Sequence, residues 1–274
     1  MSDLKAYRVP HHGKFALSDL SPSDTPAFGK AGAAKLEQHE DALKDLGKRI
    51  AKLQRALQAE QKQSLLLVLQ GMDTSGKDGT VRGVFAHTTP LGVRVHGFKR
   101  PTEDELAHDF LWRCHAVVPA KGEIMVWNRS HYEDVLVPVV NGWINKDATA
   151  KRYALINDFE RLLTENGTTI VKCMLHIDAD EQRRRLQDRI DTPEKRWKFD
   201  LGDLDVRKQW PQYQKAYDQL LGATSTAHAP WTVIPANDKL HRNLMIATLV
   251  RDRLKKMDPS YPDGPEGIEG LKIE

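Results

Sequence analysis

Hydrophobic residues recur with a helical period in the first quarter of the chain. Between residues 36 and 57 the apolar positions are spaced by seven, three, four, three and four residues, which places them on one face of a helix. They are Leu36, Leu43, Leu46, Ile50, Leu53 and Leu57. A coiled coil would show the same stripe, but this one spans fewer than about four heptads. We therefore favour a long helix that packs on its own domain.

Five short apolar runs follow, at residues 64–70, 94–98, 123–127, 169–177 and 231–235. The first, SLLLVLQ, is almost continuously apolar, as expected for a strand that is buried on both faces of a sheet. Helical segments lie between the runs. Strands that alternate with helices predict an α/β fold, in which crossover helices cover a parallel sheet.

Two of the intervening helices have recognisable starts. Thr102 and Glu105 have the spacing of a capping box, and the segment 178–181 begins a second helix in the same manner. We expect the helix after Thr102 to be continuous, with one buried face. That face comprises Leu106, Phe110, Leu111, Cys114 and Val117.

The remaining segments predict the domain organisation. Residues 1–34 are punctuated by proline and glycine and form a loop-like N-terminal extension. Residues 35–257 form a single domain, and residues 258–274 are a tail rich in proline and glycine. Because no apolar run reaches the roughly 20 residues that a membrane span needs, we expect no membrane association.

Composition narrows the choice of compartment and partner. Cys114 and Cys173 are the only cysteines, which is typical of reduced thiols in a cytoplasmic protein. The chain has 41 basic and 38 acidic residues, a formal net charge of +3. This balance does not predict a nucleic-acid-binding surface, so an anionic partner must meet a local cluster of cations.

A phosphate-binding loop follows the first strand directly. The segment 71–79, GMDTSGKDG, contains the frame G-x-x-x-x-G-K, in which backbone amides surround phosphate oxygens and Lys77 supplies a positive charge. The loop's other candidate phosphate-binding residues are Gly71, Thr74, Ser75, Gly76, Asp78 and Gly79.

Two positions that commonly contact Mg²⁺ differ from the usual pattern. Asp78 stands where a Ser or Thr hydroxyl normally follows the lysine, and the third strand leads to Asn128 where many such proteins have an aspartate. Carboxylates remain at Asp73, Glu133 and Asp134. Since Mg²⁺ needs one or two carboxylates and keeps several waters, we predict Asp73 and Glu133 as its ligands. The alternative for Asp73 is that its side chain stabilises the turn.

Cations gather after the strands, where ligands of open α/β sheets bind. Arg82 follows the loop lysine, Lys99 follows the second strand and Arg129 follows the third. A denser group lies within a predicted lid at about residues 183–215. It comprises Arg183, Arg184, Arg185, Arg189, Lys195, Arg196 and Lys198. These residues either form a solvated face neutralised by nearby acids or close over phosphates that are being transferred.

Several segments together resemble polyphosphate kinase family 2. They are GMDTSGKDG, GFKRPTEDELAHDFLWR, NRSHYEDVLV, DTPEKRWKF and IPANDK, and the resemblance extends from about residue 30 to residue 254. It implies a P-loop NTPase fold like that of thymidylate kinase, with a five-stranded parallel sheet and a helical lid. It also implies Mg²⁺-dependent, reversible phosphate transfer between inorganic polyphosphate and nucleotides, by a homo-oligomer of two or four subunits.

The resemblance also assigns roles to single residues. Lys77 would bind the transferring phosphate, with Asp73 on Mg²⁺ and Arg129 beside the phosphates. Arg189 and Lys198 would be lid contacts, and the acceptor nucleotide would meet Arg113, Glu133 and Asp134.

The segment 128–134, NRSHYED, is similar to the class III branch, which accepts both AMP and ADP and so makes ATP in two steps. Two other functions stay open from the sequence. One is an ATP-dependent nucleoside monophosphate kinase, and the other is a P-loop module that binds nucleotides without catalysis.

Overall fold

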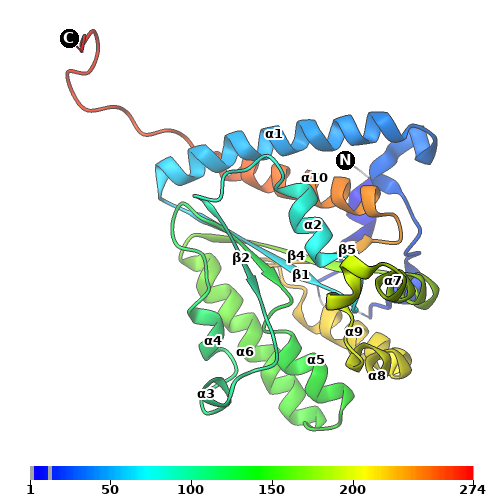
Figure 1. Cartoon of the computed structure of the whole chain (residues 1–274). Helices are drawn as coiled ribbons and strands as arrows, with labels where there is room; N and C mark the ends of the chain where they lie inside the picture. Colours follow the sequence, from blue (N-terminus) through cyan, green and yellow to red (C-terminus); the bar gives the residue numbers. More distant parts are fainter. Residues whose placement is uncertain (1–2, 12–13, 274) are drawn as a thin grey trace.

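A parallel sheet of five strands forms the centre of the computed structural model, which describes residues 3–11 and 14–273 (Figure 1). The strands lie in the order β2-β3-β1-β4-β5, and every neighbouring pair is parallel. Their bounds are β1 Ser64–Gln70, β2 Val93–Gly97, β3 Ile124–Asn128, β4 Thr168–His176 and β5 Trp231–Pro235. The predicted parallel sheet is confirmed, and each strand lies within one residue of its apolar run.

Helices cover both faces of the sheet and one end of it (Figure 1). One face carries α1 (Leu36–Glu60), α2 (Lys77–Val84) and α10 (Lys239–Met257). The other carries α5 (Glu133–Val140), α6 (Lys146–Glu165) and α9 (Trp210–Thr224). Two hydrophobic clusters result, one on each side of the sheet. Beyond the carboxyl end of the strands lie α7 (Ala179–Asp191), η4 (Pro193–Lys198) and α8 (Gly202–Lys208).

The predicted long helix is α1, and it packs along α10 on its own domain. Leu46, Ile50 and Leu57 are buried in the cluster that α1 shares with α10. Leu36, the first residue of the helix, is 54% exposed, so the packed stripe begins later than its spacing suggested.

The helix expected after Thr102 is not continuous. The capping box is present, but α3 (Glu103–Leu106) ends after one turn and α4 (Trp112–His115) begins separately. Between them the Asp109 carboxylate accepts the backbone N–H of Leu111 at 2.9 Å, a local bond that competes with the helical ladder. Leu106 is consequently 68% exposed instead of buried.

The N-terminal segment forms 3₁₀ turns and packs against the edge of the sheet. Its turns are η1 (Asp3–Tyr7), η2 (Leu17–Asp19) and η3 (Pro26–Ala34). Val9 donates its backbone N–H to Trp231 O of β5 at 3.0 Å, and both Val9 and Leu17 are buried. This segment therefore contributes side chains to the core of the domain.

At the other end of the chain, residues 261–273 are exposed and extend away from the sheet (Figure 1). Across the described parts of the chain, none of the helices combines the length and the apolarity that crossing a bilayer requires.

Candidate active site

The phosphate-binding loop joins β1 to α2 through backbone conformations that few residues adopt. Gly71 and Gly76 have φ angles of +149° and +103°, and Thr74 lies in the left-handed region at +65°. A Cβ atom at Gly71 would come within 2.6 Å of Leu175 O on the neighbouring strand. The glycine positions of the motif are therefore required by the path of the chain.

Lys77 begins α2, and its side chain turns back over this loop. Its Nζ donates to Gly71 O at 2.7 Å and Met72 O at 3.2 Å, and lies 3.5 Å from Ser75 Oγ. All three acceptors are neutral. Burial, and next the charge of Arg129, lower the pKa of Lys77 to about 8. An anion in front of the loop would offset the cost of keeping this ammonium charged.

All five N–H donors of Arg185, on α7, are bonded, and two of these bonds hold the loop. Its Nη1 bonds Thr74 O at 2.9 Å and Ser75 O at 3.1 Å, while Nη2 bonds Ala236 O at 2.7 Å and Asn237 O at 3.0 Å. Its Nε donates to Glu181. Because these acceptors belong to three segments, Arg185 ties the loop to the start of the lid and to the turn after β5.

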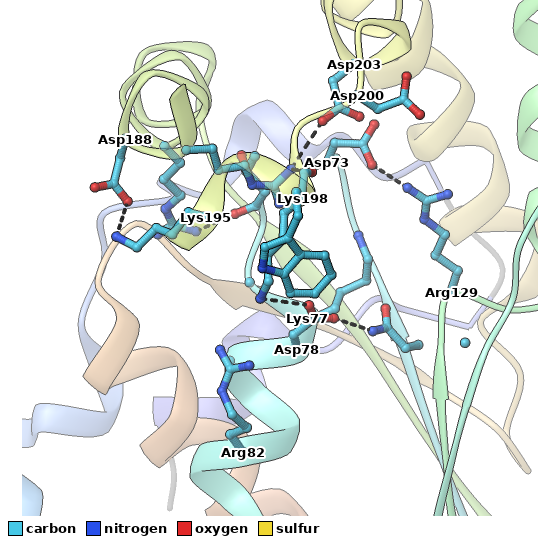
Figure 2. A pocket seen from close by; sticks show the side chains of 18 of the residues that line it. Asp73, Lys77, Asp78, Arg82, Arg129, Asp188, Lys195, Lys198, Asp200 and Asp203 are labelled. Atoms are coloured by element: carbon cyan, nitrogen blue, oxygen red, sulfur yellow. Dashed lines mark hydrogen bonds and ion pairs between the residues drawn. The ribbon is translucent and has the colours of Figure 1, made fainter. Parts of the chain in front are cut away.

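In front of the loop lies a cavity of about 580 Å³ (Figure 2). Ten cationic side chains and five carboxylates line it. The cavity thus carries more positive charge than the whole chain, whose net charge is +3. The predicted phosphate-binding residues that it includes are Thr74, Gly76, Asp78, Gly79, Arg82, Lys99, Arg189 and Lys198, together with Asp73, Lys77 and Arg129. Ser75 does not line the cavity, since its side chain is buried behind the loop.

Half of these cations are held by carboxylates in the free protein. Arg129 donates to Asp73 at 2.5 Å, and Lys195 to Asp188 at 2.8 Å (Figure 2). The other pairs are Arg189 with Asp203, Lys198 with Asp78, and Arg185 with Glu181. Asp78 also accepts from Asn128 at 2.6 Å. The two positions that depart from the usual Mg²⁺ pattern therefore bond one another.

A second cavity of about 80 Å³ lies on the β3 side of the loop and shares Asp73 and Arg129 with the first. It also includes two more of the predicted residues, Gly71 and Glu133. Glu133 is the first residue of α5, and its carboxylate accepts from Gln70 Nε2 at 2.8 Å. This carboxylate is therefore directed toward the loop.

Arg113 and Asp134 do not line either cavity. They form an ion pair of 2.8 Å, and Arg113 also donates to Lys99 O at 3.0 Å. Burial raises the pKa of Asp134, although Arg113 opposes the shift. Their contact with an acceptor nucleotide stays a prediction.

The dense cluster of the lid separates into residues with different surroundings. Arg183 and Arg184 are largely exposed and pair with acids on their own helix, as in a solvated face. Arg196 bonds Ile190 O and does not line the cavity. The cluster as a whole therefore does not face the cavity. The members that do are Arg185, Arg189, Lys195 and Lys198.

Sequence reasoning missed two cations of α10. Lys239 and Arg242 line the large cavity, and Arg242 is 2% exposed. The sequence could have indicated them by their position, because both lie in the first turn of the helix after the last strand. Ligands of open α/β sheets bind at the carboxyl ends of strands. Asp200 and Asp203 also line the cavity.

The large cavity, with its excess of cations beside the backbone amides of α2, is suited to anionic groups. Residues 3–11 and 14–273 contain no cluster of three or more His, Cys, Asp or Glu side chains that could hold a metal by themselves. Mg²⁺ commonly takes one or two carboxylates from a protein and its other ligands from water and substrate phosphates.

Comparisons with known proteins all find the same family. The family model described as "Polyphosphate kinase 2 (PPK2)" matches residues 33–262. An AMP/ADP-polyphosphate phosphotransferase of Meiothermus ruber is 49% identical over 99% of this chain and 100% of its own length. An ADP-polyphosphate phosphotransferase of Rhodopseudomonas palustris is 40% identical over 83% of both chains. The crystal structure of polyphosphate kinase 2 from Arthrobacter aurescens TC1 matches with a TM-score of 0.90 and 42% identity, over 97% of this chain and 93% of that one.

Proposed function

The chain belongs to the polyphosphate kinase 2 family, and we propose that it transfers phosphate reversibly between inorganic polyphosphate and the nucleotides AMP, ADP and ATP. The observation that carries this proposal is the loop lysine, which faces a cavity with ten cations and five carboxylates. Phosphoryl transfer depends mainly on positioning and on stabilising charge, and this lining supplies both.

Residues on both sides of the loop contribute to the transfer step. Lys77 and the amides of α2 hold the phosphate that moves, and Arg129 stabilises charge as the bond to the donor breaks. Arg189 and Lys198 come from the lid side and neutralise further phosphates. The nucleophile is a phosphate oxygen of the acceptor nucleotide. The transfer therefore needs no covalent intermediate on a side chain of the loop.

The residues near the loop fit a Mg²⁺ ion that is shared with phosphate. Burial, and next the negative charge of Asp73, raise the pKa of Asp203 to about 6, so these two carboxylates repel each other across the cavity. A divalent cation near them would relieve that repulsion. We propose Asp73 and Glu133 as the pair that would hold Mg²⁺, with Asp203 as the alternative partner of Asp73. When bound, the ion would supply positive charge that stabilises the phosphates.

Acceptance of both AMP and ADP is part of the proposal. AMP lacks the β-phosphate of ADP, so a site that serves both must stabilise phosphate in two registers. Glu133 lines the small cavity together with Asp73 and Arg129, and a cation held by Glu133 would supply positive charge to a phosphate of either acceptor. The name of the Meiothermus ruber relative, which includes both acceptors, supports the same range.

We also propose that the chain forms a homo-oligomer. Leu155 and Leu162, seven residues apart on α6, are 50% and 49% exposed. Light scattering coupled to size-exclusion chromatography tests this directly, and a monomeric mass would contradict it.

The function is tested by varying the donor while the acceptor stays fixed. Purified protein is incubated with Mg²⁺, with AMP or ADP as acceptor and with polyphosphate or ATP as the phosphate donor. The nucleotide products are then resolved by chromatography. Formation of ADP and ATP from AMP with polyphosphate alone supports the proposal. If AMP is phosphorylated only when ATP is the donor, the protein is a nucleoside monophosphate kinase. If no donor works, it is a binding module.

A further inference from the structure

The segment 20–28, near the N-terminus, is bonded to the turns at the carboxyl end of the sheet. His176, the last residue of β4, donates from Nε2 to Leu20 O at 3.2 Å. Ala27 donates its backbone N–H to Nε2 of His241, in the first turn of α10, at 3.1 Å. Both histidines are buried. Since the large cavity lies at the same end of the strands, this segment is attached to the elements that support the site.

Asn237 is the residue at which this segment meets the turn after β5. Its backbone N–H donates to Pro22 O at 3.1 Å, and its Nδ2 donates to Ser23 Oγ at 2.8 Å. The same side chain pairs with Asp178, because Nδ2 donates to Asp178 Oδ2 at 2.7 Å and Oδ1 accepts the backbone N–H of Asp178 at 3.3 Å. The backbone carbonyl of Asn237 accepts from Arg185 Nη2 at 3.0 Å. Every polar group of Asn237 therefore has a partner, either in the N-terminal segment or at α7.

The partners at α7 connect Asn237 to the phosphate loop. Asp178 is the N-cap of this helix, and its Oδ1 accepts the backbone N–H of Glu181 at 2.7 Å. Asn237 holds the other oxygen of that carboxylate. About two turns further along α7, Arg185 bonds two carbonyls of the loop and two of the turn after β5. Because a guanidinium is planar and rigid, a shift of that turn would be passed on to the loop.

An asparagine is the side chain that these bonds require. It offers one acceptor and two donors on a short stem, and all three are used here. An aspartate would place a second carboxylate against Asp178 Oδ2, and like charges so close together repel one another. Asn237 belongs to the segment IPANDK, yet it is not among the described residues that line either cavity. Its contribution to phosphate transfer must therefore be indirect.

We propose that Asn237 is a positioning residue for phosphate transfer, which holds the turn after β5 to the N-terminal segment and to the start of α7. Through Arg185 this arrangement fixes the phosphate loop. The proposal rests on the function given above. Loss of the arrangement would displace the loop relative to the phosphate that moves, so it should lower the rate of transfer more than the affinity for the acceptor nucleotide.

Three variants separate this role from a general effect on stability. Asn237→Asp keeps the size of the side chain but sets a carboxylate against that of Asp178. The exchanged pair Asn237→Asp/Asp178→Asn restores one amide facing one carboxylate, and an oxygen at position 178 can still cap α7. Asn166→Asp is the matched control, because it removes the bond from Nδ2 to Leu162 O at the exposed end of α6, where the strands begin.

Each variant is measured in two ways. Steady-state rates of ATP formation from ADP and polyphosphate give kcat and the KM for ADP. Hydrogen exchange, followed by mass spectrometry without any ligand, gives the protection of the amides in the loop, residues 71–79. Melting temperatures ensure that all rates are compared on folded protein.

For Asn237→Asp we expect kcat to fall roughly five- to twentyfold with little change in the KM for ADP, and exchange in the loop to become faster. The exchanged pair should recover most of the rate and of the protection. Asn166→Asp should lower the melting temperature but leave kcat and loop exchange unchanged. Ser23→Ala removes only the bond to the N-terminal segment, so kcat should fall about two- to threefold.

An unchanged kcat in Asn237→Asp, or a lower kcat without faster loop exchange, would overturn the proposal. So would an exchanged pair that is no better than the single variant. If Asn237→Asp does not fold, Ser23→Ala decides the matter, because normal kcat and normal loop exchange in that variant would also overturn the proposal. Failure of the proposed function is a separate result, which would appear as absence of polyphosphate-dependent activity in the unmodified protein.

Discussion

Lys77 and Lys172 are both buried lysines, but their surroundings differ in one respect. Lys172 of β4 donates to Glu160 Oε2 at 2.6 Å, to Tyr132 Oη at 2.8 Å and to Thr224 O at 2.7 Å. Lys77 donates to two carbonyl groups of its own loop and forms no ion pair among the described residues. Burial lowers the pKa of both lysines.

From this difference we infer that the Lys172 charge stabilises the fold, whereas the Lys77 charge is placed to bind an anionic ligand. Every N–H of the Lys172 ammonium has an acceptor, and one of these acceptors is a carboxylate. The protein therefore satisfies both the hydrogen bonds and the charge of this group without a ligand. Lys77 lacks the counter-charge and faces a cavity that can accept one. Its position in the loop therefore keeps a cation available at some cost in stability.

The largest effect is expected when Lys77 is removed. Lys77→Ala should lower kcat by about a thousandfold or more, because the charge on the transferring phosphate loses its nearest cation. The melting temperature should stay the same or rise, since an uncompensated buried charge is lost. Lys62→Ala, at an exposed position before β1, is the matched control and should alter neither quantity. An active Lys77→Ala protein would remove the loop from the mechanism.

Removal of Lys172 should have the opposite pattern. Lys172→Met leaves Glu160 buried without a counter-ion, so the free energy of unfolding should fall by about 3–5 kcal/mol. Turnover measured below the new melting temperature should change little. Denaturant titration measures the loss, and the double variant Lys172→Met/Glu160→Met should recover most of it. If Lys172→Met is as stable as the unmodified protein, the pair does not stabilise the packing of α6 on β4.

Arg185 shares a feature with each of these lysines. Like Lys172 it has an acceptor for every N–H, and like Lys77 it is bonded to the phosphate loop. Arg185→Lys retains the charge but has three donors in place of five, so it cannot serve both pairs of carbonyls. We expect kcat to fall roughly ten- to hundredfold, from misplacement of the loop, while the fold is retained. Arg184→Lys, at the exposed neighbouring position, should leave kcat unchanged. Full activity of Arg185→Lys would show that the loop keeps its shape unaided.

The smallest effect is expected at Glu133. Glu133→Gln keeps the size of the side chain but weakens its affinity for Mg²⁺, so phosphorylation of AMP should fall a few-fold more than that of ADP. Rates with each acceptor at several Mg²⁺ concentrations measure the ratio. An equal loss with both acceptors would mean that Glu133 only positions the start of α5 through Gln70.

The sequence was sufficient for the features that are set locally. The apolar runs located the five strands, and the glycine frame located Lys77 and its loop. Spacing alone could not show that the chain after Leu106 leaves the helix, because a single bond from Asp109 to Leu111 decides it. Nor could it separate Arg185, which braces the loop, from its exposed neighbour Arg184. Lys239 and Arg242 join the site only because β5 ends beside β4, a long-range property of the sheet.

Among the described residues, half of the cations that line the large cavity form no ion pair, and we expect them to bind the phosphates of a polyphosphate donor. Calorimetric titration of the unmodified protein with long-chain polyphosphate, without nucleotide and over a series of salt concentrations, tests this directly. We expect tight binding whose Kd rises steeply with salt, because several charge contacts are screened together. Arg82→Gln/Lys239→Gln should bind more weakly, with a shallower salt dependence. Absence of binding, or a Kd that does not change with salt, would contradict this expectation.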